Sequence, residues 1–280
     1  MLKTICIKSN NLQVNNYLIE NIKKFKNTNI FLSVHEFSVY TNIILHYKGS
    51  EIKEYNILIK KISSLLANTV IKFYNNYLLK NKLNTNYFYF NDFEKTKILE
   101  YCTENCNEIN FNKKRKKLIA NLFKEYFSYN KKVILDGFIT FYLYDYFKLL
   151  DKIIDQSINN YLIEKEYHEF IDLLKIYIST EPPKTDIIHL IYKNDSAILL
   201  NKKGEKINID TNLKTKFLSD INFSENDYCL NTLLNLLPKE LIIYNDNKKD
   251  EFLNTLEQIF ENRIRLGTLE QPETGYFYQK

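Results

Sequence analysis

The first fifty residues show two different hydrophobic periods. A period of two predicts strands over residues 4–7, 30–34 and 39–47, because alternate side chains of a strand point to opposite faces. Between the first two strands, residues 11–25 carry apolar side chains mainly along one side of a helix. This order of elements predicts a small antiparallel or mixed sheet with a helix on one face.

A helical period dominates the middle of the chain. Apolar residues recur every three or four positions over 50–80, 91–106 and 112–127, which predicts three helices. The strongest helical signal spans 136–180, where we expect two long helices or one helix interrupted near Asn159-Asn160. Residues 133–135 fit either a short strand or the start of a helix. The expected N-caps are Asn91 or Asp92 for the second helix and Asn112 for the third.

Pro182 and Pro183 end this helical region, since proline lacks the amide hydrogen that a helix needs. The period of two then returns over 187–192, and Asn194-Asp195-Ser196 turns this strand into a second one. The remaining elements are a strand after Lys203-Gly204, a helix over 227–237, a strand over 241–244, a helix over 248–261 and a strand over 263–266. The last three predict a right-handed parallel crossover. We expect residues 268–280 to be a loose tail.

The whole pattern predicts a mixed α/β fold. Its parts are an N-terminal β-α-β-β unit, a helix-rich centre, and a C-terminal β-hairpin plus β-α-β sheet. We expect an N-terminal α/β region with long helices at 1–110, a helical region at 111–181, and a C-terminal α/β region with the tail at 182–280.

The composition is that of a globular protein, with 45% hydrophobic and 26% charged residues among 280. The 22 Tyr and 19 Phe supply large side chains for a core. The four cysteines show no dense disulfide spacing, and residues 1–8 alternate instead of forming a signal peptide. Because no apolar run is long enough to span a membrane, we expect a cytoplasmic protein.

Positive charge is concentrated in one run, although the net charge is only +5. Residues 111–135 contain eight Lys or Arg and one Glu. Five of these cations are consecutive: Lys113, Lys114, Arg115, Lys116 and Lys117. Such a run could contact nucleic-acid phosphates or an anionic surface, or it could form the solvated side of a helix. The chain has only three arginines, the side chains that read guanine edges, so sequence-specific DNA recognition is disfavoured.

Two pairs of side chains have the spacing of metal ligands on a helix. Cys102 and Cys106 are four residues apart, as are His168 and Asp172, so each pair lies on one helix face. Neither pair has the further ligands of a zinc, di-iron or His-Glu-x-x-His site. We therefore expect no metal and no cofactor, and we keep a metal-dependent enzyme using the acidic helix with His168 as an alternative.

Catalytic signatures are also missing from the sequence. No two of the five glycines are close enough for a dinucleotide or P-loop phosphate site, and no Ser occurs in Gly-x-Ser-x-Gly. The sequence therefore favours a protein that is not an enzyme, with no catalytic residues.

One part of the chain is similar to a known family. Asp136-Gly137-Phe138-Ile139-Thr140-Phe141 leads to Glu166-Tyr167-His168-Glu169-Phe170-Ile171 and then to Glu181-Pro182 and a strand with Ile188-His189-Leu190. Over about residues 133–266 the chain resembles the YtxC-like family of sporulation proteins from endospore-forming Firmicutes. The resemblance implies a sporulation-associated cytoplasmic role and carries no established molecular activity.

We therefore expect an accessory protein that binds another protein through its acidic helix. The apolar stripe of this helix is expected to pack inward, and it comprises Ile163, Tyr167, Phe170, Leu174 and Tyr177. The acids stay outward as a docking face, whose predicted binding residues are Glu166, Tyr167, Glu169 and Phe170. The alternatives are the metal-dependent enzyme and a protein that binds nucleic acid or an anionic surface through Lys113–Lys117.

Overall fold

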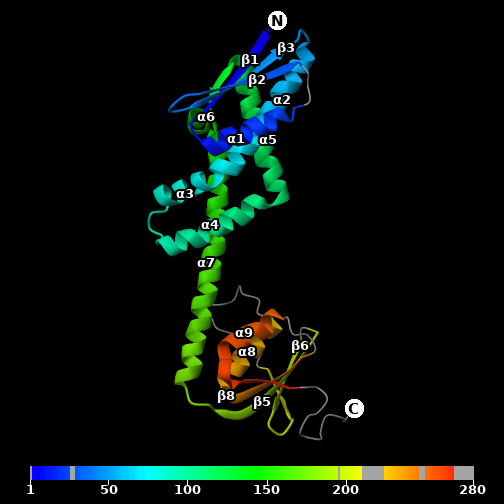
Figure 1. Ribbon diagram of the computed structural model, residues 1–280. Coiled ribbons are helices and arrows are strands. Elements are labelled where there is room, and N and C mark those ends of the chain that lie inside the picture. The colour runs from blue at the N-terminus through cyan, green and yellow to red at the C-terminus, as the bar shows by residue number, and fades with distance from the viewer. Residues whose placement is uncertain (1, 26–28, 195, 210–223, 246–249, 268–280) are drawn as a thin grey trace. The chain divides into compact units, whose positions relative to one another are not determined.

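The computed structural model describes residues 2–25, 29–194, 196–209, 224–245 and 250–267. They form two compact units, unit 1 with residues 1–163 and unit 2 with residues 164–280 (Figure 1). The helix that carries the basic run packs on the first long helix, inside unit 1. The three regions expected from the sequence stay a prediction.

Unit 1 contains a mixed sheet with the strand order β2-β3-β1-β4. β3 (Thr41–Lys48) lies antiparallel to both β1 (Leu2–Ser9) and β2 (Ile30–Glu36). β4 (Lys132–Ile134) pairs with the other edge of β1 in parallel orientation. The predicted N-terminal β-α-β-β unit is confirmed, and the undecided segment at 133–135 begins as a strand of the same sheet.

α1 (Leu12–Lys23) follows β1 directly. It begins there because the Asn11 side chain accepts hydrogen bonds from the backbone N–H groups of Gln13 and Val14. Its buried side chains, among them Val14 and Leu18, pack against the sheet in the core of unit 1. The loop between β1 and α1 is therefore held at the carboxyl end of β1.

The long helix predicted after residue 50 contains a π-helical turn. α2 (Ile52–Thr69) continues through the turn η1 (Val70–Tyr74) into α3 (Asn75–Asn86). A π turn shifts the hydrogen-bond pattern by one residue and is often found at functional sites. The hydrophobic period predicted the helix but not this turn.

The next two helices test the predicted N-caps. α4 (Asp92–Asn107) begins at Asn91, which forms the expected cap as part of a capping box with Glu94. α5 (Ile109–Tyr129) begins before Asn112, so the predicted cap at Asn112 is wrong. The Asn112 side chain lies inside the helix and accepts a hydrogen bond from Arg115 Nε at 3.1 Å.

The family-like segment forms one short and one long helix. α6 (Leu135–Tyr142) is separated from α7 (Tyr144–Thr180) at Leu143, and α7 is not interrupted at Asn159-Asn160. Ser157, Ile158 and Tyr161 are buried on both sides of the two asparagines. This tertiary packing outweighs the low helix propensity of Asn, so the predicted interruption is wrong. The alternative of two long helices is wrong as well, because α6 has only 8 residues.

Unit 2 is built on a mixed sheet with the strand order β7-β6-β5-β8-β9. β5 pairs antiparallel with β6 and parallel with β8, and β8 pairs parallel with β9, so the predicted hairpin and β-α-β arrangement are confirmed. α8 and α9 pack beside the sheet (Figure 1). The expected tail at 268–280 lies outside the described residues. In chain order the elements are β5 (Thr185–Lys193), β6 (Ser196–Asn201), β7 (Lys206–Ile207), α8 (Glu225–Leu236), β8 (Pro238–Asn245), α9 (Glu251–Phe260), the 3₁₀ turn η2 (Glu261–Arg263) and β9 (Ile264–Gly267).

Each unit has its own hydrophobic core. The core of unit 1 joins the sheet to α1 through α6 and to the first part of α7. The core of unit 2 joins β5, β6 and β8 to α8, α9 and the last part of α7. The predicted mixed α/β fold is confirmed.

Candidate functional site

One side of α7 is fixed onto unit 2. Ile171 and Ile178 are buried in the core of this unit. Tyr167 Oη forms a hydrogen bond of 2.8 Å with Thr255 Oγ1 of α9, and Arg263 donates to the Ile178 carbonyl. The inner side of the helix is therefore held by both apolar and polar contacts.

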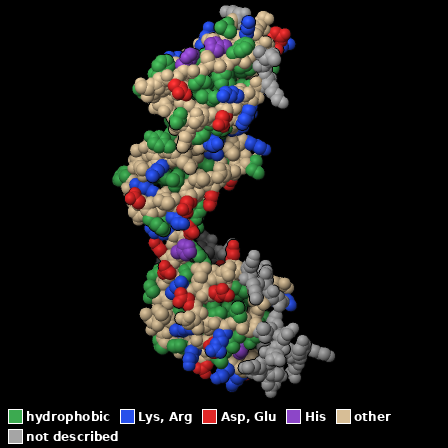
Figure 2. Space-filling model, in the orientation of Figure 1, with side chains coloured by type: hydrophobic (Ala, Val, Ile, Leu, Met, Phe, Trp, Pro, Cys, Tyr) green, Lys and Arg blue, Asp and Glu red, His purple; other side chains and the backbone are tan. Residues whose placement is uncertain are grey.

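The opposite side of α7 exposes large apolar side chains. Phe170, Leu173 and Ile176 are 52%, 64% and 59% exposed. We name this stripe the α7 face, and it consists of Glu166, Glu169, Phe170, Leu173, Ile176 and Tyr177. On the side of the molecule shown in Figure 2, hydrophobic side chains of unit 2 are interspersed with acidic and basic ones.

The expected packing of the α7 stripe is wrong in part. All five stripe residues were expected to pack inward, but Ile163, Tyr167, Phe170 and Tyr177 are exposed and only Leu174 is half-buried. The buried side is centred on Ile171 and Ile178, which the sequence stripe did not include. A helix that carries apolar residues on several sides can bury any one of those sides. The neighbouring strands and helices of unit 2 therefore determine which side of α7 is buried.

The predicted binding residues occupy two different positions. Glu166, Glu169 and Phe170 share the α7 face and are exposed. Tyr167 is also partly exposed, but its hydroxyl group is bonded to Thr255. Their role in binding stays a prediction.

The candidate metal pairs lie in different environments. His168 Nε2 is 3.8 Å from Glu164 Oε1 on the exposed surface of α7. Cys102 and Cys106 are buried in unit 1, and burial raises the pKa of the Cys102 thiol to about 11. In the part of the chain that the structure describes, no group of three or more His, Cys, Asp or Glu could hold a metal ion.

The helix α5 places the residues of the basic run on different sides, some buried and some exposed. Lys113, Lys114 and Lys117 are exposed on α5 and Lys116 is half-buried, but Arg115 is only 3% exposed. Lys113 and Lys116 line a pocket of about 390 Å³ together with three asparagines. Arg115 therefore does not share the surface of the four lysines, whose predicted role in nucleic-acid or anion binding stays a prediction.

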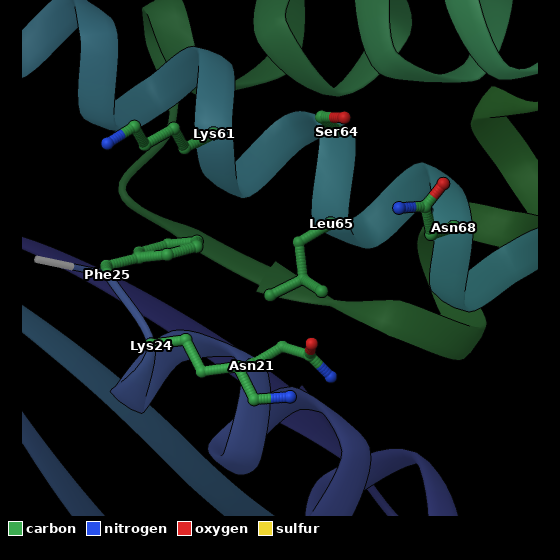
Figure 3. Close-up of a pocket in the computed structure, with 7 residues that line it drawn as sticks. All are labelled: Asn21, Lys24, Phe25, Lys61, Ser64, Leu65 and Asn68. Atoms are coloured by element: carbon green, nitrogen blue, oxygen red, sulfur yellow. The ribbon is translucent and has the colours of Figure 1, made fainter.

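A pocket between α1 and α2 has a volume of about 570 Å³. Figure 3 shows that Asn21 and Leu65 point into the space between the two helices. The ammonium groups of Lys24 and Lys61 point away from each other in the same view. Because its charged groups do not converge on one position, this pocket does not define a ligand site.

A more convergent arrangement occurs at the carboxyl ends of β1 and β4. These strands are parallel, so the segments that follow Ser9 and Ile134 meet at the same edge of the sheet. Asn11 begins α1 there, and Asp136 lies in the first turn of α6. A pocket of about 710 Å³ lies at this edge, and we name it the Asp136 pocket. The residues that line it include Asn11, Phe73, Tyr74, Tyr77, Asp136 and Phe147.

The π-helical turn brings Tyr74 to this carboxylate. Tyr74 Oη donates a hydrogen bond of 3.1 Å to Asp136 Oδ1. Burial, followed by the charge and hydrogen bond of Asp136, raises the pKa of Tyr74, while a contact with the Ser9 hydroxyl acts in the opposite direction. The phenol therefore stays protonated at neutral pH and orients the carboxylate.

Sequence reasoning did not identify the Asp136 pocket. Its residues come from three distant segments, around 11, 73–81 and 136–147, which only the tertiary structure brings together. The one available signal was that the family-like segment begins at Asp136.

Comparison with known proteins supports the family-like character of this segment. Residues 60–265 match the YtxC-like family, and the chain therefore belongs to that family. The match begins in α2 and ends in β9, so it is wider than the resemblance over 133–266 and includes both Asp136 and the α7 face.

One similar protein is "Uncharacterized protein YtxC" of Bacillus subtilis (strain 168). It is 23% identical over 130 residues, which are 46% of this chain and 46% of that relative. The comparison with solved structures finds no match. Of the helices that the structure describes, none is both long enough and apolar enough to span a membrane.

Proposed function

We propose that this chain is a cytoplasmic accessory protein of sporulation that binds a protein partner through the α7 face. The observation that carries the proposal is the exposure of Phe170, Leu173 and Ile176 on successive turns of one helix. Large apolar side chains that line one exposed stripe are typical of helix docking surfaces. The inner side of the same helix is held by unit 2, so the stripe is presented on a rigid support.

The charges of the α7 face indicate the chemistry of its partner. Glu166 precedes Phe170 by one helical turn and Glu169 precedes Leu173 by one turn, and both glutamates are exposed. The partner is therefore an amphipathic segment whose apolar residues are edged by Lys or Arg. Opposite charges at the rim mainly determine which partner is selected and how fast it associates.

The sporulation part of the proposal is supported by family membership. The chain belongs to the YtxC-like family. The resemblance of its central segment to that family implies a sporulation-associated role in the cytoplasm. The α7 face and sporulation are separate parts of the proposal, and the experiments below test them separately.

The variant Phe170→Ala/Leu173→Ala tests the α7 face. Both side chains are mainly exposed, so the fold is retained and only the apolar stripe is shortened. Cross-linking in sporulating cells of the native host, followed by mass spectrometry, is expected to identify a partner of the wild-type chain that the variant loses. The matched control is Phe88→Ala/Ile109→Ala, which removes two even more exposed apolar side chains from unit 1 and keeps the partner.

The same partner is also expected to depend on the negative charges of Glu166 and Glu169. Glu166→Lys/Glu169→Lys is expected to weaken binding between the purified proteins, and Lys→Glu changes at the partner's basic edge restore it. Unchanged binding by both α7 variants would overturn the docking role. A normal spore yield after deletion of the gene would overturn the sporulation role and leave the docking role standing.

A further inference from the structure

The Asp136 pocket combines a single carboxylate with aromatic walls. Asp136 supplies the negative charge, and rings are contributed by Phe73, Tyr74, Tyr77 and Phe147. Among the described residues that line the pocket, none is Lys or Arg. We propose that it binds a small organic cation, in which an ammonium or amidinium group is attached to an apolar body. This site is independent of the α7 face.

The carboxylate is held in a position to accept such a ligand. Tyr74 donates to Asp136 Oδ1, and none of the described residues donates to Oδ2. The Thr140 hydroxyl donates to the backbone carbonyl of Asp136 and so does not compete for its carboxylate. Oδ2 is therefore available for a charge-assisted hydrogen bond from a cation.

The aromatic walls add a second attraction for positive charge. The chain's own lysines already lie on two of these rings: Lys72 Nζ is 5.3 Å from the centroid of Phe73, and Lys82 Nζ is 5.5 Å from that of Phe147. These contacts have the geometry of cation–π interactions. Lys82 is ion-paired with Asp151 and Lys72 is exposed to water, so neither charge neutralises Asp136.

The position of the pocket in the fold supports a ligand site. In sheets with parallel strands, ligands bind at the carboxyl ends of the strands, where the following loops diverge. β1 and β4 are such a parallel pair, and Asn11 and Asp136 lie just beyond their carboxyl ends. The π-helical turn η1 supplies Phe73 and Tyr74 from a third segment.

Calorimetric titration with benzamidine and benzamide tests this assignment on the full-length chain. The two probes have similar shape, but only benzamidine is a cation at neutral pH. We expect saturable binding of benzamidine and weaker binding of benzamide. Asp136→Asn retains an acceptor for Tyr74 and is expected to weaken benzamidine binding about tenfold, the loss of one charge-assisted contact.

Two further variants separate a specific site from general effects. Tyr77→Ala removes an exposed wall ring and is expected to weaken both probes, whereas Asp145→Asn neutralises an exposed acid outside the pocket and leaves both unchanged. Equal binding of benzamidine by the wild type and Asp136→Asn would overturn the proposal. Absence of saturable benzamidine binding to the folded wild type would overturn it as well.

Discussion

Tyr74 and Asn75 are adjacent in sequence but hydrogen-bond to different parts of unit 1. Tyr74 donates to Asp136, whereas the side-chain oxygen of Asn75 accepts a bond from Tyr146 Oη at 2.5 Å. Asn75 and Tyr146 are buried, and the positive charge of buried Arg115 favours the ionised form of the Tyr146 phenol. Burial nevertheless raises the pKa of Tyr146, so its hydroxyl group remains a donor at neutral pH.

Removal of this hydroxyl group is expected to destabilise unit 1. In Tyr146→Phe the Asn75 oxygen loses its donor inside the core, which costs about 1–3 kcal/mol of unfolding free energy. Urea unfolding followed by circular dichroism measures the loss. Tyr129→Phe, at a highly exposed tyrosine, is the control and is expected to unfold like the wild type. A Tyr146→Phe variant with unchanged stability would contradict the importance of this contact.

At the scale of single elements, a polar cap side chain marks the start of α1, α4, α8 and α9. α4 and α8 both start with a capping box, formed by Asn91 with Glu94 and by Ser224 with Asp227. In each box the cap side chain accepts from a backbone N–H of the first turn, and the acid accepts from the backbone N–H of the cap residue. These contacts satisfy donors that the helix itself cannot pair.

The cap of α4 gives an element-scale prediction. Asn91→Ala is expected to lower the unfolding free energy by about 0.5–2 kcal/mol, and Asn91→Gly by only a few tenths, because Gly keeps the backbone geometry of a cap. Chemical denaturation of the full-length protein measures both. Asn56→Ala, at an exposed position inside α2, should not destabilise the protein. Equal effects of Asn91→Ala and Asn91→Gly would argue against the cap.

At the scale of the whole molecule, the chain has two separate cores joined by one continuous helix. The first part of α7 contributes Tyr146, Leu150 and Ile154 to unit 1, and its last part contributes Ile171 and Ile178 to unit 2. Each unit also has its own sheet. A local loss of packing should therefore destabilise one unit more than the other.

Hydrogen exchange can resolve the two units. Leu241→Ala leaves a cavity in the core of unit 2 and is expected to cost about 2–5 kcal/mol. Amide protection should fall in β5 and β8, while β1 and β3 keep theirs, and Ile43→Ala in unit 1 should produce the reverse pattern. Loss of protection throughout the chain in both variants would show that the units unfold together.

The positions of most elements follow from short-range patterns. The period of two located the strands at 30–34 and 187–192, and Asn91 located the start of α4. Asn112 has the same side chain as Asn91 but lies inside a helix, where Arg115 uses it as an acceptor. An asparagine therefore predicts an N-cap only where its side-chain oxygen is not already used by another donor, as Arg115 uses that of Asn112.

The sequence by itself determined the order and type of most strands and helices and the mixed α/β class, because these depend on residue spacing and local propensity. The family was indicated by a separate signal, the resemblance of the segments around Asp136 and Glu166. Tertiary structure decided that Arg115 is buried, that Phe170 is exposed, and that Tyr74 reaches Asp136. Burial depends on what other segments cover a side chain. A pocket depends on residues that are distant in sequence but close in space. Periodicity along the chain carries neither kind of information, since it describes only the sides of each element.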